Sequence, residues 1–182
     1  MRTDFSDASV GIRRFRPGDV PLLYEAACES ASELAVWLPW FHANYSMDET
    51  EAYIFKSVVD WEKGAEYNFV IFDVKDGELL GGTALNHVNT VNKCANLGYW
   101  VRSSRTRRGV ASTATRLIAR FGLREIGFHR LEIMAAIENK PSQRVAEKAG
   151  AKREGLLRKR LVLHGQPHDA VVYSLVEEDF NS

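Results

Sequence analysis

Residues 96–121, NLGYWVRSSRTRRGVASTATRLIARF, decide the fold of this chain. The apolar and aromatic run from Ala95 to Val101 is typical of a buried strand. We expect a tight turn over residues 105–111, and the helix that follows it begins at about Val110. The N–H groups and partial positive charge at such a helix N-terminus suit a phosphate or pyrophosphate group. Apolar residues recur along this helix at the spacing of one face, at Ala114, Leu117, Ile118 and Phe121.

The turn also contains Arg105, Arg107 and Arg108, which would add charge-assisted donors around a bound phosphate. A run of arginines is equally typical of a solvated surface, so both interpretations stay open at this point. The turn lacks the glycine spacing and the lysine of the Rossmann and P-loop fingerprints, which excludes those two kinds of phosphate site.

The composition of the 182 residues limits the class of protein. A hydrophobic content of 45% supports one core, so we expect a single domain over residues 1–182. The 24 basic and 24 acidic residues cancel, which argues against direct binding to nucleic acid. No apolar run is long enough for a membrane helix, and residues 1–10 lack the apolar core of a signal peptide. The two cysteines and five histidines have no paired or metal-binding spacing, so we expect no metal and a cytoplasmic location.

The order of the remaining elements predicts a mixed α/β sheet, because strand pairs are followed by strand–helix–strand–helix–strand. Further helices are expected over residues 20–30, 46–64 and 139–149, with the central helix stopping by Gly127. Asp19, the Ser46–Glu49 capping box and Asn139 are expected to cap them. Ile54, Val58 and Trp61 should share the buried side of the second helix. Turns are expected at Asp76-Gly77 and over 87–92 and 164–169, and strands over 11–16, 67–74, 78–86, 130–137, 152–163 and 170–176.

The segment Trp37-Leu38-Pro39-Trp40-Phe41 is dense in aromatic side chains. Such a cluster is more often part of a core or a wall than a functional site. The alternative is that Trp37 and Trp40 line a pocket for an acceptor molecule.

The loop Thr106-Arg107-Arg108-Gly109-Val110-Ala111 keeps the glycine and the small residue of a Gln/Arg-x-x-Gly-x-Gly/Ala loop and departs from it at Thr106. With this loop and other motifs the chain resembles, over nearly its whole length, the Gcn5-related N-acetyltransferases (GNAT). Within them it resembles the RimJ/RimL group, which includes ribosomal-protein N-terminal acetyltransferases. The other motifs are Trp37 and Trp40, Asn92-Lys93, Leu97-Gly98-Tyr99-Trp100, Asn139-x-x-Ser142, Glu154-Gly155 and Gly165-x-x-His168-Asp169.

The resemblance implies the acyl-CoA N-acyltransferase fold, a mixed, mostly antiparallel central sheet flanked by helices, with acetyl-CoA as cofactor. The implied reaction is attack of a primary amine on the acetyl thioester, with the oxyanion held by a strand N–H near Trp100 or Val101. The residues that we expect to bind the acceptor are Trp37, Trp40, Asn86 and His87. Those implied for the coenzyme are Trp100, Val101, Arg107, Arg108, Gly109, Val110, Ala111, Ser112, Asn139 and Ser142.

Much of the superfamily protonates the leaving thiol with a tyrosine, but Ala146 stands at that position here. The resemblance to the RimJ/RimL group gives this role to Ser142. A thiolate with a pKa of about 8.5 needs little more than a hydrogen bond. Ser142 alternatively only supports the helix N-terminus. Asn139 is expected as an N-cap, as a contact to the pantetheine arm, or as both.

Asn96 and Leu161 stand where related enzymes have a glutamate base. An α-amine is roughly a tenth neutral at pH 7 and a lysine amine well under a thousandth, a difference worth roughly 3.4 kcal/mol. A site without a dedicated base therefore favours an α-amine, with water taking the proton. The candidates left for a base are Glu154, Asp169, His87 and His168, and the two carboxylates join Ser142 as predicted catalytic residues.

We therefore expect an acetyl-CoA-dependent N-acetyltransferase that acts on a protein N-terminus, with a ribosomal protein as one such partner, in a ternary complex. A homodimer is compatible with this, and no membrane partner is expected. Two alternatives stay open: a small amine, such as a polyamine or an amine-bearing antibiotic, and an acyl-CoA-binding module without turnover. The acidic residues 48–51 are the only sign of a polyamine pocket, and a negatively charged first helical turn explains them better.

Overall fold

The computed structural model describes residues 3–180 and arranges them around one eight-stranded sheet. The strand order is β1-β2-β3-β4-β5-β6-β8-β7, and each neighbouring pair is antiparallel except β5 and β6. This mixed, mostly antiparallel sheet confirms the predicted fold class. The strands are β1 (Asp4–Ser6), β2 (Val10–Arg14), β3 (Tyr67–Asp73), β4 (Leu79–Asn89), β5 (Cys94–Val101), β6 (Arg130–Ala136), β7 (Lys152–Leu163) and β8 (Gln166–Leu175).

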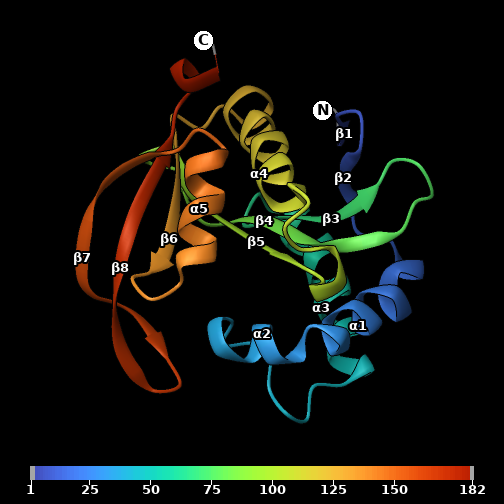
Figure 1. The fold of residues 1–182 in the computed structure, drawn as a ribbon. Coiled ribbons are helices and arrows are strands. Elements are labelled where there is room, and N and C mark those ends of the chain that lie inside the picture. The colour runs from blue at the N-terminus through green and yellow to red at the C-terminus, as the bar shows by residue number, and fades with distance from the viewer. Residues whose placement is uncertain (1–2, 181–182) are drawn as a thin grey trace.

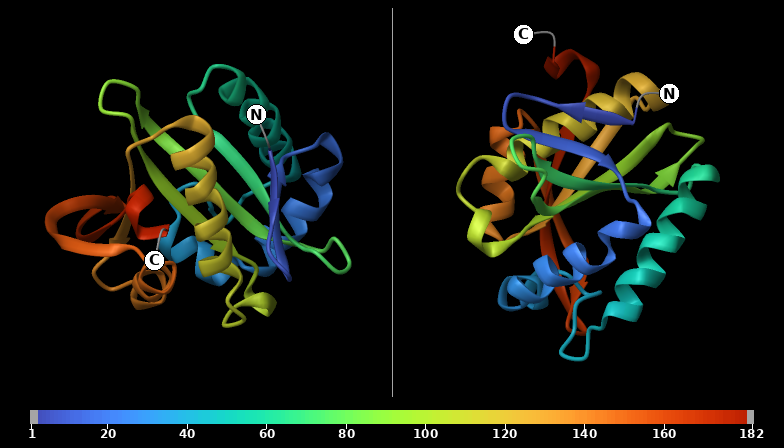
Figure 2. Two further views of the ribbon diagram at one scale, coloured as in Figure 1. Left: turned by 90° about the horizontal axis from the view of Figure 1, so that it is seen from above. Right: turned by 90° about the vertical axis from the view of Figure 1, so that its right-hand side faces the viewer.

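Helices cover both faces of this sheet. Helices α4 and α5 lie on one face, and α1, α2 and α3 lie on the other side (Figure 1, Figure 2). Their bounds are α1 (Val20–Glu29), α2 (Ala31–Trp37), α3 (Met47–Glu62), α4 (Val110–Arg120) and α5 (Lys140–Lys148). None of the helices within residues 3–180 is long and apolar enough to cross a membrane.

The packing of α4 confirms the spacing that predicted it. Its predicted apolar face is at most 5% exposed. Phe121 begins a π-helical turn that continues α4, and its ring lies 5.0 to 5.5 Å from those of Trp61, Tyr67 and Phe69. Burial of each large side chain contributes about 1.5–3 kcal/mol. This core therefore fixes α4 against the middle of the sheet.

Strands β5 and β6 separate after three residue pairs, Cys94 with Arg130, Ala95 with Leu131 and Asn96 with Glu132. Beyond them β5 pairs only with β4, and β6 only with β8. We call the space between the diverging strands the β5–β6 opening (Figure 1). Because parallel strands end at the same edge of a sheet, the N-termini of α4 and α5, which follow these strands, both lie at this edge.

Two side chains do not have their predicted roles. Asp19 precedes α1 but does not cap it, because its carboxylate accepts from the Arg13 guanidinium at 2.7 Å twice and from Arg16 N at 2.8 Å. A bidentate guanidinium is a stronger donor than a helix N–H group. Val58 is 42% exposed. The buried side of α3 is formed instead by Thr50, Ile54, Ser57 and Trp61.

Two expected turns are shorter than predicted, and two elements were not predicted. Strand β4 continues past His87, whose φ of +49° marks an irregularity in the pairing with β5. Strand β8 begins early, which leaves His164 and Gly165 as a two-residue turn. Their φ angles of +51° and +73° are typical of a type I′ hairpin. Strand β1 and helix α2 are the elements that the sequence analysis missed.

Candidate active site

The N-terminus of α4 is open to an anion. Gly109 precedes the helix with a φ of +83°, and no side chain caps the first N–H groups. The Ser112 hydroxyl donates to the Gly109 carbonyl at 2.9 Å, and Val110 is only 6% exposed. Both side chains therefore hold the turn and leave anion binding to the backbone. Arg107 and Arg108 are exposed beside it, and no ion pair engages them within the described residues.

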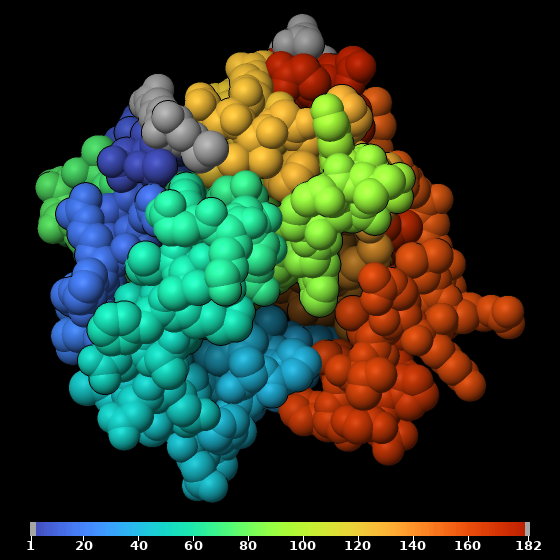
Figure 3. Space-filling model, turned by 180° about the vertical axis from the view of Figure 1, so that it is seen from behind, coloured from blue at the N-terminus to red at the C-terminus, as the bar shows by residue number. Residues whose placement is uncertain are grey.

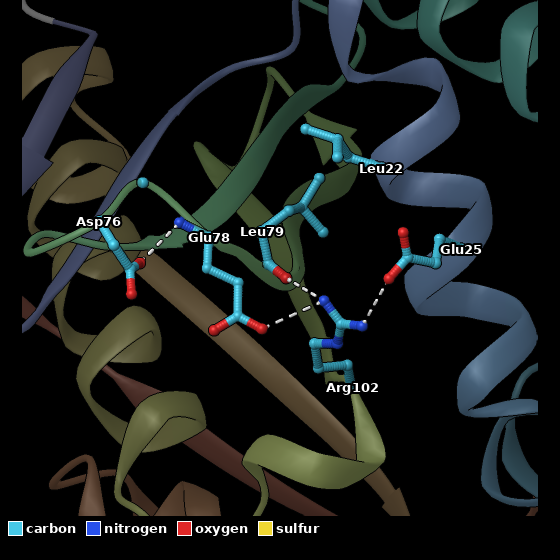
Figure 4. Close-up of a pocket in the computed structure, with 7 residues that line it drawn as sticks. Leu22, Glu25, Asp76, Glu78, Leu79 and Arg102 are labelled. Carbon is cyan, nitrogen blue, oxygen red and sulfur yellow. Dashed lines mark hydrogen bonds and ion pairs between the residues drawn. The ribbon is translucent and has the colours of Figure 1, made fainter.

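Arg105 is held elsewhere, which corrects its expected role. Its Nη2 lies 2.6 Å from Glu78 Oε2, so it is not available as a phosphate donor. Figure 4 shows the neighbouring Arg102 between Glu25 and Glu78. Arg102 also pairs with Glu29 at 2.5 Å. This hydrogen bond is the main reason why the pKa of Glu29 is lowered to about 2. Carboxylates of α1 and of the β3–β4 hairpin thus fix the segment that leads to Gly109.

The end of β5 offers a backbone donor to the opening. Arg102 N donates to the Leu80 carbonyl of β4 at 2.8 Å. The Trp100 carbonyl lies so close to β4 that a Cβ on Gly81 would be 2.2 Å from its oxygen. Both groups point toward β4, and the alternation of a strand therefore turns the N–H of Val101 toward the opening. Of the two positions expected for the oxyanion donor, the geometry favours Val101 over Trp100.

The N-terminus of α5 brings Ser142 to the same opening. Asn139 is the N-cap, as predicted, because its Oδ1 accepts from Ser142 N at 3.0 Å. Ser142 is half-buried, and its Oγ lies 3.1 Å from the phenol oxygen of Tyr99, which comes from β5. Ala146, at the position of the superfamily tyrosine, is fully buried and offers no donor.

The other face of the sheet is hollowed. Figure 3 shows this hollow between α3, the β4–β5 hairpin and the β7–β8 hairpin. Asn86, Asn96 and Glu132 are cross-strand partners on β4, β5 and β6, and Asn96 Nδ2 donates to Asn86 Oδ1 at 2.7 Å. Because Ala95 and Leu97, on either side of Asn96, are buried in the core that includes α4, this polar row faces away from α4.

The aromatic segment that precedes α3 is divided between core and surface. Phe41 packs against Ala27 and Leu34, whereas Trp40 is 42% exposed with its ring 6.2 Å from that of Trp100. Trp37 ends α2 and is half-buried. The β7–β8 hairpin reaches α2 through His164 Nε2, which lies 3.3 Å from the Val36 carbonyl oxygen.

Comparison with known proteins agrees with this geometry. A family model of the acetyltransferase (GNAT) domain matches residues 9–152. The chain belongs to the GNAT acetyltransferase family. This acetyltransferase is 31% identical to a Bacillus subtilis (strain 168) protein named provisionally as the ribosomal N-acetyltransferase YdaF, with 94% of this chain and 93% of that one covered. It is 27% identical to the ribosomal-protein-serine acetyltransferase of Escherichia coli (strain K12), with 85% of each chain covered.

Solved structures give the same result. Mycobacterium smegmatis RimJ in complex with CoA-disulfide superposes with a TM-score of 0.84 at 26% identity, covering 95% of this chain and 84% of that one. The predicted resemblance to the RimJ/RimL group is therefore confirmed. This acetyltransferase is an N-acetyltransferase of the GNAT type with acetyl-CoA as its donor. The uncapped N-terminus of α4 offers free N–H groups of the kind that bind the phosphates of such a donor.

The two carboxylates expected to be catalytic have other partners in this acetyltransferase. Glu154 pairs with Arg130 at 2.5 and 2.6 Å and accepts from the Ser174 hydroxyl at 2.7 Å. The guanidinium, and then the hydroxyl, hold the pKa of Glu154 at about 2, which makes it a weak base. Asp169 Oδ1 accepts from Lys159 N at 2.8 Å and so supports the irregularity in β7. The ion pair of Glu154 argues against its predicted role as a base, and the catalytic role of Asp169 stays a prediction.

Glu132 is the ionisable group that the sequence analysis missed. It is half-buried, directly opposite Asn96, and its Oε1 accepts from Arg130 Nε at 2.9 Å. The alternation of buried Leu131 and Ile133 around it was the signal that could have placed it on the same face of the sheet as Asn96. The histidine candidates lie at the margins: His87 is exposed at the irregularity of β4, and His168 Nδ1 is 3.6 Å from Glu138 Oε2.

Proposed function

We propose that this acetyltransferase acetylates the α-amine of a protein N-terminus by direct attack on acetyl-CoA in a ternary complex, with ribosomal proteins as the first acceptors to test. The observation that supports this most is the amide pair of Asn96 and Asn86, bonded at 2.7 Å on the acceptor face of β5. Two amides cannot take a proton at neutral pH. An acceptor that is already partly neutral then has an advantage of roughly 3.4 kcal/mol over a lysine amine.

The remaining groups have separate roles in this proposal. The N–H groups of α4, with Arg107 and Arg108, bind the pyrophosphate, while the N–H of Val101 binds the thioester oxygen. Asn139 fixes the first turn of α5 and contacts the pantetheine arm. The Ser142 hydroxyl donates a hydrogen bond to the leaving sulfur. Trp40, Trp37, Asn86 and His87 border the acceptor, and water takes the proton of the amine.

One observation supports a second acceptor class, a small amine or a lysine. Glu132 lies directly opposite Asn96, at the position of the missing base, on the face of the sheet turned away from α4. Its Oε1 accepts from Arg130 Nε at 2.9 Å. A carboxylate there could receive a proton from a more basic amine. Glu132→Gln separates the two cases, because only the second needs that carboxylate.

The experiment is mass spectrometry after incubation with acetyl-CoA and a panel of acceptors. The panel contains peptides with free N-termini beginning with Ser, Ala or Met, N-blocked lysine peptides, and polyamines. We expect acetyl on the α-amines, with Glu132→Gln retaining most of that activity. Acetyl on lysine or polyamine that is lost in Glu132→Gln would establish the second class instead. Binding of coenzyme A without any product would favour a binding module without turnover.

The proposal includes a cytoplasmic location, where ribosomal acceptors are made, and a homodimeric state. Exposed apolar side chains on the outer side of α3, Phe55, Val58 and Val59, support the latter. Light scattering of the purified protein measures the dimer directly.

A further inference from the structure

Tyr99 spans the β5–β6 opening on the face that carries α4 and α5. Its phenol donates to the main-chain carbonyl of Ser142 at 2.9 Å and lies 3.1 Å from the Ser142 Oγ. The side chain is half-buried against the core, so its hydroxyl is held in place while it lines the opening. The superfamily tyrosine is absent at Ala146, yet a tyrosine hydroxyl reaches the start of α5 from the opposite strand.

The Ser142 hydroxyl has one proton and can donate it to only one of two acceptors, the phenol oxygen of Tyr99 or a sulfur in the opening. If it donates to Tyr99, it cannot donate to a sulfur in the opening. The phenol of Tyr99 also has only one proton, and a three-centre hydrogen bond that shares it between the Ser142 carbonyl at 2.9 Å and the Ser142 Oγ at 3.1 Å leaves the serine proton for the sulfur. Donation into an oxygen also strengthens the bond that this oxygen donates, by roughly 10–30%.

The phenol remains able to donate over the whole working range of pH. Burial raises the pKa of Tyr99 to about 12, with a smaller contribution from Tyr173 on β8, although the hydrogen bond to Ser142 acts in the opposite direction. Tyr99 therefore does not supply a proton of its own. It supplies a fixed donor.

We propose that Tyr99 is a positioning residue for Ser142: its phenol shares one proton between the Ser142 carbonyl and the Ser142 Oγ, and so directs the serine proton at the sulfur of coenzyme A. No proton leaves Tyr99 or Ser142 in this step. The amine nitrogen forms a bond to the acetyl carbon as the C–S bond breaks, the sulfur departs as a thiolate stabilised by the serine hydrogen bond, and the proton of the amine goes to water. The inference rests on the proposed role of Ser142.

A purely structural role for Tyr99 is the alternative, because the same hydrogen bond ties α5 to β5. The chain offers a matched control for it. Tyr173 on β8 donates to Glu147 Oε1 of α5 at 3.0 Å and is 1% exposed. Tyr173→Phe therefore removes a comparable hydroxyl bond to α5 without touching Ser142.

The test measures the pKa of the thiol of bound coenzyme A, from the ultraviolet absorbance of the thiolate across a pH titration. The proteins compared are wild type, Tyr99→Phe, Ser142→Ala, the double variant and Tyr173→Phe. We expect the bound thiol of the wild type to titrate below the usual value of about 8.5. Tyr99→Phe should reduce the ratio of thiolate to thiol about threefold to tenfold, Ser142→Ala at least as much, and the double variant no more than Ser142→Ala. Tyr173→Phe should leave the ratio unchanged while lowering the Tm as Tyr99→Phe does.

The proposal would be overturned if Tyr99→Phe changed the ratio of thiolate to thiol by the same factor with and without the Ser142 hydroxyl. It would also be overturned if Tyr173→Phe changed that ratio as much as Tyr99→Phe does. If Tyr99→Phe does not fold, 3-fluorotyrosine is placed at position 99 instead. Its more acidic phenol is a stronger donor, so we expect the pKa of the bound thiol to fall, where Tyr99→Phe would raise it. No such lowering would also overturn the proposal. Failure of the proposed role of Ser142 can be distinguished from failure of the Tyr99 proposal, because Ser142→Ala would then leave the pKa of the bound thiol unchanged. The acceptor panel tests the identity of the acceptor independently.

Discussion

Gly81 carries the closest backbone approach in the active site. A Cβ there would lie 2.2 Å from the Trp100 carbonyl oxygen and 2.9 Å from the Val101 Cα, both of them backbone atoms. Gly81→Ala must therefore push β4 and β5 apart beside the N–H of Val101. We expect it to lower the free energy of unfolding by about 1–3 kcal/mol, measured by urea denaturation. Gly98→Ala on β5 is the control, because a Cβ at Gly98 meets nothing within 4 Å. Equal losses in both variants would contradict this account.

Glu154 makes stability depend on pH. Its pKa is held at about 2 in the folded chain, against 4.5 for an ordinary glutamate. A lowered pKa means that the ion pair with Arg130 stabilises the fold above about pH 4.5 and that this contribution is lost as the pH falls toward 2. We expect Glu154→Gln to cost about 0.5–1 kcal/mol at pH 7, because the pair is partly exposed, and nothing near pH 2. Urea denaturation of Glu154→Gln and the wild type at several pH values measures this difference in the free energy of unfolding. Glu125→Gln, an exposed glutamate with no ion pair within residues 3–180, should show no such trend.

Single residues were predictable where their partners are close in sequence. The Ser46–Glu49 capping box and the Asn139 N-cap both form as expected, because donor and acceptor lie within three residues of each other. Glu154 and Arg105 were not predictable, since their partners Arg130 and Glu78 are brought to them by the folding of the sheet. A charged residue in a motif therefore says little until its ion-pair partner is known.

The N-terminus of α4 should bind coenzyme A through Arg107 and Arg108 and not through Arg105. Replacing both Arg107 and Arg108 with Ala removes two exposed cations beside the uncapped N–H groups. We expect the affinity for coenzyme A to fall about tenfold and to lose part of its salt dependence, measured by calorimetry at two ionic strengths. Arg105→Ala should leave the affinity within about twofold, because Arg105 is bound to Glu78. A loss in Arg105→Ala as large as in the double variant would show that Arg105 leaves Glu78 for the phosphate.

Whole elements were predictable in proportion to their length and periodicity. Helix α4 presents a continuous apolar face, and α3 has a capping box, so both were found. Helix α2 has seven residues and only Leu34 buried, and β1 has three residues, so neither leaves a periodic pattern. The extension of β4 beyond His87 was missed because turn-forming residues there sit inside an irregular strand.

At the scale of the molecule, the fold class followed from the order of elements, but the division of the site did not. The β5–β6 opening exists because the two strands pair over only three residues, which is a property of the packed sheet. Helices α4 and α5 lie on one face of the sheet, and Figure 3 shows the hollow on the other. Asn96 and Glu132 share the face turned away from α4, and the ring of Trp40 lies 6.2 Å from that of Trp100. In the function that we propose, the two substrates approach the opening from opposite sides at the same time. Cys94 lies at the closed end of the β5–β6 pair, and Cys28 is exposed on α1, so neither is placed to carry an acetyl group.

This arrangement predicts a sequential mechanism whose two sides respond to different variants. Initial rates at several concentrations of acetyl-CoA and acceptor peptide should give intersecting double-reciprocal lines, and intact-mass spectrometry should find no acetylated enzyme.

Trp40→Ala should raise the KM for the peptide severalfold with little change in the KM for acetyl-CoA, because it removes contact area only from the hollow. The Arg107 and Arg108 double variant should do the reverse. Leu22→Ala on α1, an apolar residue with 46% of its surface accessible, controls for the loss of exposed apolar surface elsewhere. Parallel double-reciprocal lines together with an acetylated enzyme would show a covalent route in place of the ternary complex. A variant that raised both KM values equally would show that the two faces are not separate sites.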